Sequence, residues 1–108
     1  MGADSLAEFE LLVMLAALRL GPEDAYAVTI ADDIRGRTGR SVRRANVFTA
    51  LGRLEKKGFV STRLGTPRPD RGGRPPRLVA VTPTGVAAVR TTTQAIQAMM
   101  GQLTLGDA

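Results

Sequence analysis

The chain of 108 residues contains no cysteine, no histidine and no tryptophan. Without cysteine it can form neither a disulfide nor a thiolate metal site, and without histidine it lacks the commonest metal ligand and general base. We therefore expect no metal, no other cofactor and no enzymatic activity. The longest unbroken apolar run, Leu11 to Leu18, is far shorter than the roughly 20 residues that a membrane-spanning helix needs. No basic segment of the kind found in signal peptides precedes this run, so the sequence predicts a cytoplasmic protein.

Charge is distributed unevenly along the chain. Between Met1 and Asp33 one basic residue accompanies seven acidic ones, whereas between Ile34 and Arg77 thirteen Lys or Arg residues accompany only two acidic ones. Clustered Lys and Arg attract polyanions because they displace the counterions condensed on phosphates. This segregation favours a nucleic-acid-binding face, and the alternative is an arginine-rich solvated surface.

The segment from Val42 to Gly58 is the most informative part of the sequence. Its apolar residues recur at helical spacing and should share one face of a helix. These residues are Val47, Phe48, Leu51 and Leu54. The rest of the helix surface is basic, and Gly58 is placed to end the helix in a left-handed conformation. We expect this helix to enter a nucleic-acid groove while its apolar face holds it to a small core.

Two further helices are predicted before this segment. The first spans about Leu6 to Leu20 and should be capped by Asp4 or Ser5, and the second spans about Ala25 to Arg37 and should be capped by Asp24. The first helix is apolar around most of its circumference, so it must be covered on several sides. Either its own chain alone or a second subunit as well would provide this cover.

Tyr26, the only tyrosine, lies at the start of the second helix. It could line a ligand pocket between this helix and a dimer interface. The alternative is a core aromatic residue whose hydroxyl group reaches the surface.

Two β-strands are predicted after Gly58, from Phe59 to Leu64 and from Arg77 to Thr82, because their side chains alternate and several are β-branched. The connecting residues 65–76 are rich in proline, glycine and arginine, and they should form an exposed loop, which we call the wing. Arginine at such a tip suits a narrow minor groove or the flanking phosphates, although a disordered solvated loop is the alternative. The wing residues expected to contact DNA are Arg68, Arg71, Arg74 and Arg77.

A last helix should begin with Thr82 as its cap and Pro83 at its first position. Its apolar residues, from Val86 to Leu103, step by three and four as in a heptad repeat, which calls for a partner helix. We therefore expect a dimer held by the first and last helices, with docking inside one chain as the alternative. The residues expected at the dimer interface are Leu6, Phe9, Val13, Val86, Val89, Ile96, Met100 and Leu103.

A family resemblance covers nearly everything from Glu8 to Val89. It is carried, in order, by EFELLVMLAALRLGPEDAYAVTIADDI, RTGRSV, VFTALGRLEKKGFVSTRLG, GGRPPRL and VTPTGVAAV. These stretches resemble the PadR-like family of bacterial winged helix-turn-helix transcriptional regulators, and the single helix after the wing is similar to the family's short subgroup.

The resemblance implies a mainly α fold with a small two-stranded β-hairpin. Residues 1–82 would form the winged helix-turn-helix DNA-binding domain, and residues 83–108 would form a C-terminal dimerisation helix packed on the same domain. It also implies a homodimeric repressor that places two central helices in successive major grooves of a near-palindromic operator. Some members of the family release DNA when a small hydrophobic ligand binds near the dimer interface.

Several positions depart from the family pattern. Ala27 replaces a usual glycine, and Phe48 replaces a usual tyrosine. Arg43 and Arg44 stand where a serine and a hydrophobic residue are common, which removes a helix cap worth about 1 kcal/mol. Val79 and Ala80 replace a frequent tyrosine and arginine. Because two tyrosine hydroxyl groups are lost, an aromatic-acid effector does not follow from the resemblance.

Basic and polar residues around the central helix are the candidates for DNA contact. Arg can bond guanine and Asn can bond adenine, so we expect base contacts from Arg43, Arg44, Asn46 and Thr49. We expect phosphate contacts from Arg40, Arg53, Lys56 and Lys57. Arg53 could instead pair with an acidic residue of the first two helices. The alternative function is a winged-helix protein-interaction module that binds an acidic partner through the same basic face.

Overall fold

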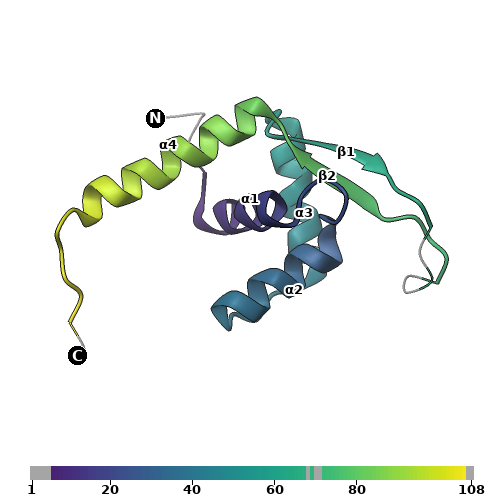
Figure 1. Ribbon diagram of the computed structural model, residues 1–108, viewed down its shortest axis with the longest axis horizontal. Helices are drawn as coiled ribbons and strands as arrows, with labels where there is room; N and C mark the ends of the chain where they lie inside the picture. The colour runs from purple at the N-terminus through teal and green to yellow at the C-terminus, as the bar shows by residue number, and fades with distance from the viewer. Residues whose placement is uncertain (1–5, 68, 70–71, 107–108) are drawn as a thin grey trace.

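The computed structural model of the protein describes residues 6–67, 69 and 72–106. Over these residues the chain forms four helices and one antiparallel hairpin (Figure 1). In chain order the elements are α1 (Glu8–Leu20), α2 (Ala27–Thr38), α3 (Arg44–Lys56), β1 (Val60–Leu64), β2 (Arg77–Val81) and α4 (Pro83–Met100). The predicted fold class, mainly α with a small two-stranded hairpin, is confirmed.

Helices α1 and α2 both begin two residues later than predicted. Asp4 and Ser5, the predicted caps of the first helix, lie outside the described residues, and Ala7 occupies the N-cap position of α1. The prediction that Asp24 caps the second helix is wrong, because the backbone around Asp24 forms a turn and Tyr26 is the N-cap. The Tyr26 side chain does not cap the helix, but the Oγ1 atom of Thr29 accepts a hydrogen bond from the Tyr26 amide at 3.0 Å.

Helix α3 packs on the core with one face, as the sequence predicts, but that face is narrower than expected. Val47, Leu51 and Leu54 are buried, whereas Phe48 is 63% exposed. Consecutive residues of a helix lie about 100° apart around its axis, so Phe48 falls outside the arc that its neighbour Val47 shares with the core. Lys56 is the last helical residue, and Gly58 follows in the predicted left-handed conformation with φ +79°.

The hairpin pairs β1 with β2 from Val60 opposite Val81 to Leu64 opposite Arg77. Both predicted strands were one residue too long at the end where the hairpin meets the helices. Thr82 leaves the sheet there to cap α4, and its Oγ1 accepts from the Gly85 amide at 3.0 Å, as predicted. The same hydroxyl donates to the Gly58 carbonyl at 2.7 Å, so one side chain ties the end of the hairpin to the start of α4.

The core lies around α1, which contacts the other three helices and β2. Its largest fully buried apolar side chains come from α1, α2, α3, β2 and the residue before β2, Pro76. They include Val13, Met14, Ile30, Val47, Leu54 and Val79. Among the described residues, no helix has the combination of length and apolar character that spanning a bilayer requires.

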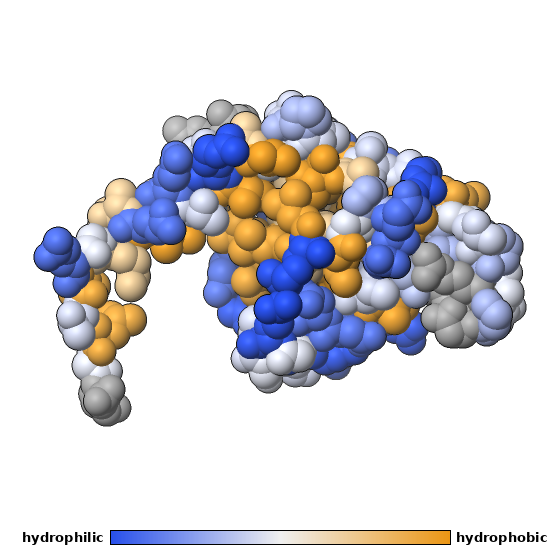
Figure 2. All heavy atoms as spheres, in the orientation of Figure 1, coloured by the Kyte–Doolittle hydropathy of each residue, from blue (hydrophilic) through white to orange (hydrophobic). Residues whose placement is uncertain are grey.

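Helix α4 belongs to the core at its N-terminal end only. Val89 is buried, and Thr92 accepts a hydrogen bond from the Leu6 amide at 3.2 Å across the start of α1. Beyond this point the helix projects from the body of the protein (Figure 1). Figure 2 shows that apolar side chains continue onto this projecting arm, where Met99 is 84% exposed.

Candidate nucleic-acid interface

Helices α2 and α3 are joined by a short turn. Gly39, with φ +71°, ends α2 in the left-handed conformation, and the Arg35 guanidinium donates to the Val42 carbonyl at 2.7 Å. Arg43 is the N-cap of α3, and no side chain caps this helix. The first turn of α3 therefore keeps backbone N–H groups without a side-chain acceptor, next to two arginines.

The four residues predicted to contact bases all lie on the exposed surface of the N-terminal half of α3 or its cap. In the part of the chain that the structure describes, Arg43 and Arg44 form no ion pair, so their guanidinium groups are available to a ligand. Thr49 is less available, because its hydroxyl group donates to the Ala45 carbonyl at 3.0 Å within the helix. Asn46 is exposed. Base contact by these residues stays a prediction.

Three of the four residues predicted to contact phosphate are held by carboxylates of α1. Arg40 donates to both carboxylate oxygens of Glu8, at 2.9 and 3.0 Å. Arg53 donates through Nε to Glu10 at 3.2 Å, and Lys57 donates to the same carboxylate at 3.3 Å. The sequence-based alternative for Arg53, pairing with an acidic residue of the first two helices, is therefore observed.

Lys56 is the fourth predicted phosphate contact. It is exposed and has no ion pair with any residue that the structure describes. It lies in the last turn of α3. Its ammonium group is free to meet a phosphate without first leaving a carboxylate.

Glu10 is the functional candidate that sequence reasoning missed. It is buried, although it lies in an otherwise apolar stretch of α1. Burial raises the pKa of Glu10, but hydrogen bonds from Arg53, Lys57 and the Ala7 amide outweigh this effect and hold the pKa below its usual value. Glu10 is therefore ionised at neutral pH. A single carboxylate between apolar neighbours was the signal that could have found it.

A polar hollow of about 350 Å³ lies between the start of α1, the turn and α3. It brings together two of the predicted base contacts and two of the predicted phosphate contacts, which the sequence analysis had assigned to different roles. The hollow is lined by Phe9, Arg40, Ser41, Val42, Asn46, Thr49 and Arg53.

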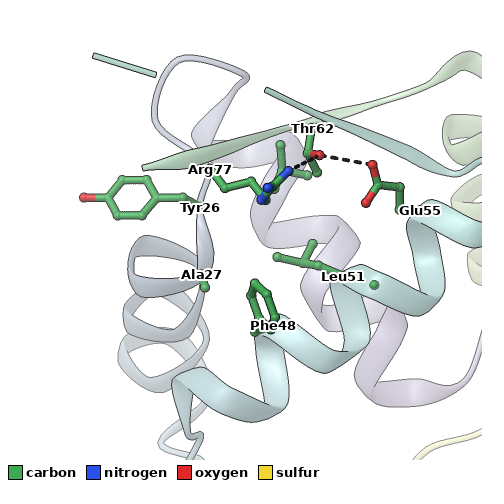
Figure 3. Close-up of a pocket in the computed structure, with 9 residues that line it drawn as sticks. Tyr26, Ala27, Phe48, Leu51, Glu55, Thr62 and Arg77 are labelled. Atoms are coloured by element: carbon green, nitrogen blue, oxygen red, sulfur yellow. Dashed lines mark hydrogen bonds between the residues drawn. The ribbon is translucent and has the colours of Figure 1, made fainter. Parts of the chain in front are cut away.

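A second cavity, of about 390 Å³, lies between α2, α3 and the hairpin (Figure 3). Phe48 and Leu51 point into it from α3, whereas the ring of Tyr26 points away from both (Figure 3). One wall is a chain of hydrogen bonds in which Arg77 donates to the Thr62 hydroxyl at 3.2 Å and Thr62 donates to Glu55 at 3.1 Å. This chain ties both strands of the hairpin to the end of α3.

The predicted wing arginines differ in their surroundings. Arg68 and Arg71 lie outside the described residues, and Arg74 is exposed on the loop. Arg77 is exposed too, but it lies at the start of β2 and lines the cavity beside α3. Its guanidinium group is therefore directed toward α3 and not toward the tip of the wing.

The residues predicted at a dimer interface divide into three groups. Leu6, Val13 and Val89 are buried within a single chain, which argues against their contact with a second subunit because they have almost no surface left to cover. Phe9 and Val86 are half-buried. Ile96 and Met100 are exposed on the projecting end of α4, and Leu103 is exposed just beyond it.

No cluster of three or more acidic side chains that could hold a metal ion is found among residues 6–67, 69 and 72–106. The polar groups that converge at the surface are instead mostly basic, and they are carried by α3, by the turn before it and by the hairpin after it.

The succession of α2, turn, α3 and a two-stranded wing defines a winged helix-turn-helix protein. No protein-family model matches the sequence, and no curated protein matches it. Solved structures do match, and those described below show that the fold is that of PadR-family transcriptional regulators. The predicted resemblance to this family is confirmed at the level of the fold.

Three of these structures illustrate the match. A transcriptional regulator from Clostridium thermocellum is 18% identical, with a TM-score of 0.69 and 87% of each chain covered. A PadR family transcription regulator from Clostridium difficile is 20% identical, with a TM-score of 0.68, and the match covers 89% of this chain and 97% of that one. A PadR family regulator from Eggerthella lenta is 21% identical, with a TM-score of 0.65, over 88% of this chain and 80% of that one. At these identities the likeness establishes the fold alone.

Proposed function

We propose that this protein is a sequence-specific double-stranded DNA-binding transcriptional regulator of the bacterial cytoplasm. The observation that carries the proposal is the concentration of basic side chains on α3, the turn before it and the wing, while seven of the ten acidic residues of the chain precede α3 in the sequence. Proteins with the same fold are described as transcriptional regulators, which supports this reading.

In the proposed complex, α3 enters the major groove and its N-terminal end faces the base edges. Arg43, Arg44 and Asn46 are exposed there, and their side chains have the donors that recognise guanine and adenine. Lys56 and the exposed wing residue Arg74 meet backbone phosphates, which position the protein without reading sequence. The N-terminal end of α3 would then recognise the bases, while the C-terminal end of α3 and the wing would hold the protein on the DNA backbone.

We further propose that the active form is a homodimer joined through the projecting end of α4 and acting as a repressor on a near-palindromic operator. Two copies related by a two-fold axis present two α3 helices, so the operator repeats the same half-site with inverted orientation. An exposed apolar cluster at the end of α4 supports a protein contact there. It consists of Ala95, Ile96, Met99, Met100 and Leu103.

A small hydrophobic ligand that releases DNA would fit the cavity between α2, α3 and the hairpin. Its lining includes Ala27, Leu51 and Val79, and the elements around it are those proposed to touch DNA, so occupancy would compete with binding. Benzyl alcohol, used as a small apolar probe, should shift the methyl NMR resonances of these three residues and weaken duplex binding. Shifts confined to Ile96 and Met100 would instead place the ligand on α4.

The main test is binding to a random-sequence duplex of about two helical turns, measured by fluorescence anisotropy at several salt concentrations. A dimer that neutralises several phosphates should lose affinity steeply, with a log–log slope of roughly −5 or steeper. No binding at low salt, together with binding to an acidic protein, would favour the protein-interaction module instead.

Sequence specificity is tested by selecting duplexes from a random pool with the unmodified protein and with two variants. Arg44→Ala should change the selected sequence, whereas the matched Lys56→Ala variant should weaken binding to every duplex about equally. If the two variants behave alike, the assignment of base contacts to the start of α3 is wrong.

A further inference from the structure

The contact between Glu10 and α3 is unusual for a DNA-facing surface. Glu10 has a side chain only 6% exposed, yet its partners are at the surface, Arg53 on α3 and Lys57 at the C-cap of α3. The three charges sum to one positive charge, and the negative one is fixed beneath the other two. An acidic residue at this place would be expected to repel DNA unless it does something else.

The geometry of the Arg53 contact suggests what else it does. Arg53 uses only Nε toward Glu10, and its two terminal amino groups have no partner among the residues that the structure describes. A guanidinium group is planar and offers donors along more than one edge, so a carboxylate on one edge fixes the plane and directs another edge outward. Arg53 is 53% exposed, and its side chain lines the polar hollow between α1 and α3.

The hollow has the size and the donors that a phosphodiester group needs. Arg40 lines it together with Arg53, and Ser41, Asn46 and Thr49 add polar side chains. Arginine recognises phosphate through paired, charge-assisted hydrogen bonds, which require that the guanidinium group already has the right orientation.

We propose that this hollow seats one backbone phosphate of the bound DNA, and that Glu10 is a positioning residue that orients Arg53 toward that phosphate. The inference rests on the proposed DNA-binding function. In this arrangement Asn46 and Thr49 contact the phosphate instead of the bases assigned to them above, and base reading is left to Arg43 and Arg44.

The pair of Glu8 with Arg40 differs from the pair of Glu10 with Arg53. It also pairs with an arginine of the hollow, but its side chain is 71% exposed and its two oxygens share a single nitrogen of Arg40. Such a surface pair holds its arginine weakly. Glu8 therefore acts as a competitor of phosphate for Arg40 and does not orient it.

The two roles predict effects of opposite sign, measured as Kd for a random-sequence duplex at fixed salt. Glu8→Gln removes a competing negative charge and should tighten binding by about threefold. Glu10→Gln removes the same charge but also the orientation of Arg53, and it should weaken binding by about tenfold. Charge alone would make both variants bind more tightly.

A purely structural role of Glu10 is separated by three further measurements. Thermal melting shows whether Glu10→Gln remains folded at the assay temperature. Arg53→Gln should reduce the salt slope by about one for each bound protomer. Adding Glu10→Gln to it should no longer weaken binding, because only the gain from removing the negative charge remains. Arg53→Lys keeps the charge without the planar group and should weaken binding about as much as Glu10→Gln, which tests the proposal in a chain that keeps Glu10.

The outcomes are distinct. The proposal is overturned if Glu10→Gln tightens binding as Glu8→Gln does, if it weakens binding equally with and without Arg53, or if Arg53→Lys binds like the unmodified protein. Failure of the unmodified protein to bind any duplex at low salt would refute the proposed function itself.

Discussion

Replacing Gly85 with alanine should destabilise the protein by roughly 3 kcal/mol, at the upper end of what overpacking a core costs. A Cβ atom at Gly85 would lie 2.1 Å from the Phe59 carbonyl oxygen and 2.9 Å from Cγ1 of Val81. The oxygen belongs to the backbone, so it cannot rotate away as a side chain could. Relief would require α4 to move off the hairpin, and the hydrogen bond from the Gly85 amide to Thr82 would be strained as it moves.

Thermal unfolding followed by circular dichroism measures this effect, and the Tm should fall by at least about 10 °C. Gly36→Ala is the matched control. A Cβ atom there meets no atom within 4 Å, and Gly36 lies inside α2 with ordinary helical geometry. Alanine at Gly36 should therefore raise stability by about 0.5–1 kcal/mol. Equal Tm values for the two variants would show that α4 does not pack against the hairpin as described.

The double substitution Ile96→Glu and Met100→Glu should convert the proposed dimer into monomers. Both side chains belong to an apolar cluster on the projecting end of α4 that also contains Ala95, Met99 and Leu103. Two carboxylates per chain, facing their copies across a two-fold axis, would be desolvated and would repel one another. The dimer dissociation constant should rise by at least about 100-fold, measured by sedimentation equilibrium.

The matched control is Gln97→Glu, which adds a negative charge to the same turn of α4 outside the cluster. It should leave the dissociation constant within about threefold of the unmodified protein. These substitutions are a cleaner test than removing α4, because Gly85, Ala88 and Val89 belong to the core of the chain and would be lost with it. A double variant that still forms a dimer would show that subunits meet elsewhere.

The sequence predicted the elements well where the signals are local. The left-handed glycine after α3 and the Thr-Pro start of α4 depend on the backbone preferences of one or two residues. They could be identified without knowing what surrounds them. The hairpin was also predictable, because two alternating, β-branched segments on either side of a Pro- and Gly-rich stretch are typical of a hairpin and of few other structures.

Predictions were wrong where the structure of a residue depends on the elements packed around it. Phe48 was expected in the core because it is apolar and adjacent to Val47, but burial depends on the arc of α3 that faces α1 and α2, and Phe48 lies beyond it. Asp24 was a plausible cap by residue type, yet a turn starting at Gly21 uses the backbone around it.

The candidate site could be predicted only in part, for a related reason. The basic character of α3 is visible in the sequence, but the pairing of Glu10 with Arg53 and Lys57 joins residues more than 40 positions apart. No local pattern encodes such a contact. The heptad spacing of α4 likewise does not show where the helix leaves its own core, which the structure places after Thr92.

Helix α4 is continuous from the core to its exposed end, so its length sets the distance between the two. One unbroken helix carries the core contacts at Val89 and the exposed cluster around Met99. In the proposed dimer, the length of helix between them would therefore fix the distance and the angle between the partner subunit and α3. Inserting a single residue between them would turn the exposed cluster by about 100° and shift it by about 1.5 Å. In a dimer built on this cluster, the spacing between operator half-sites would thus be set by the number of residues in a helix that lies outside the wing and α3.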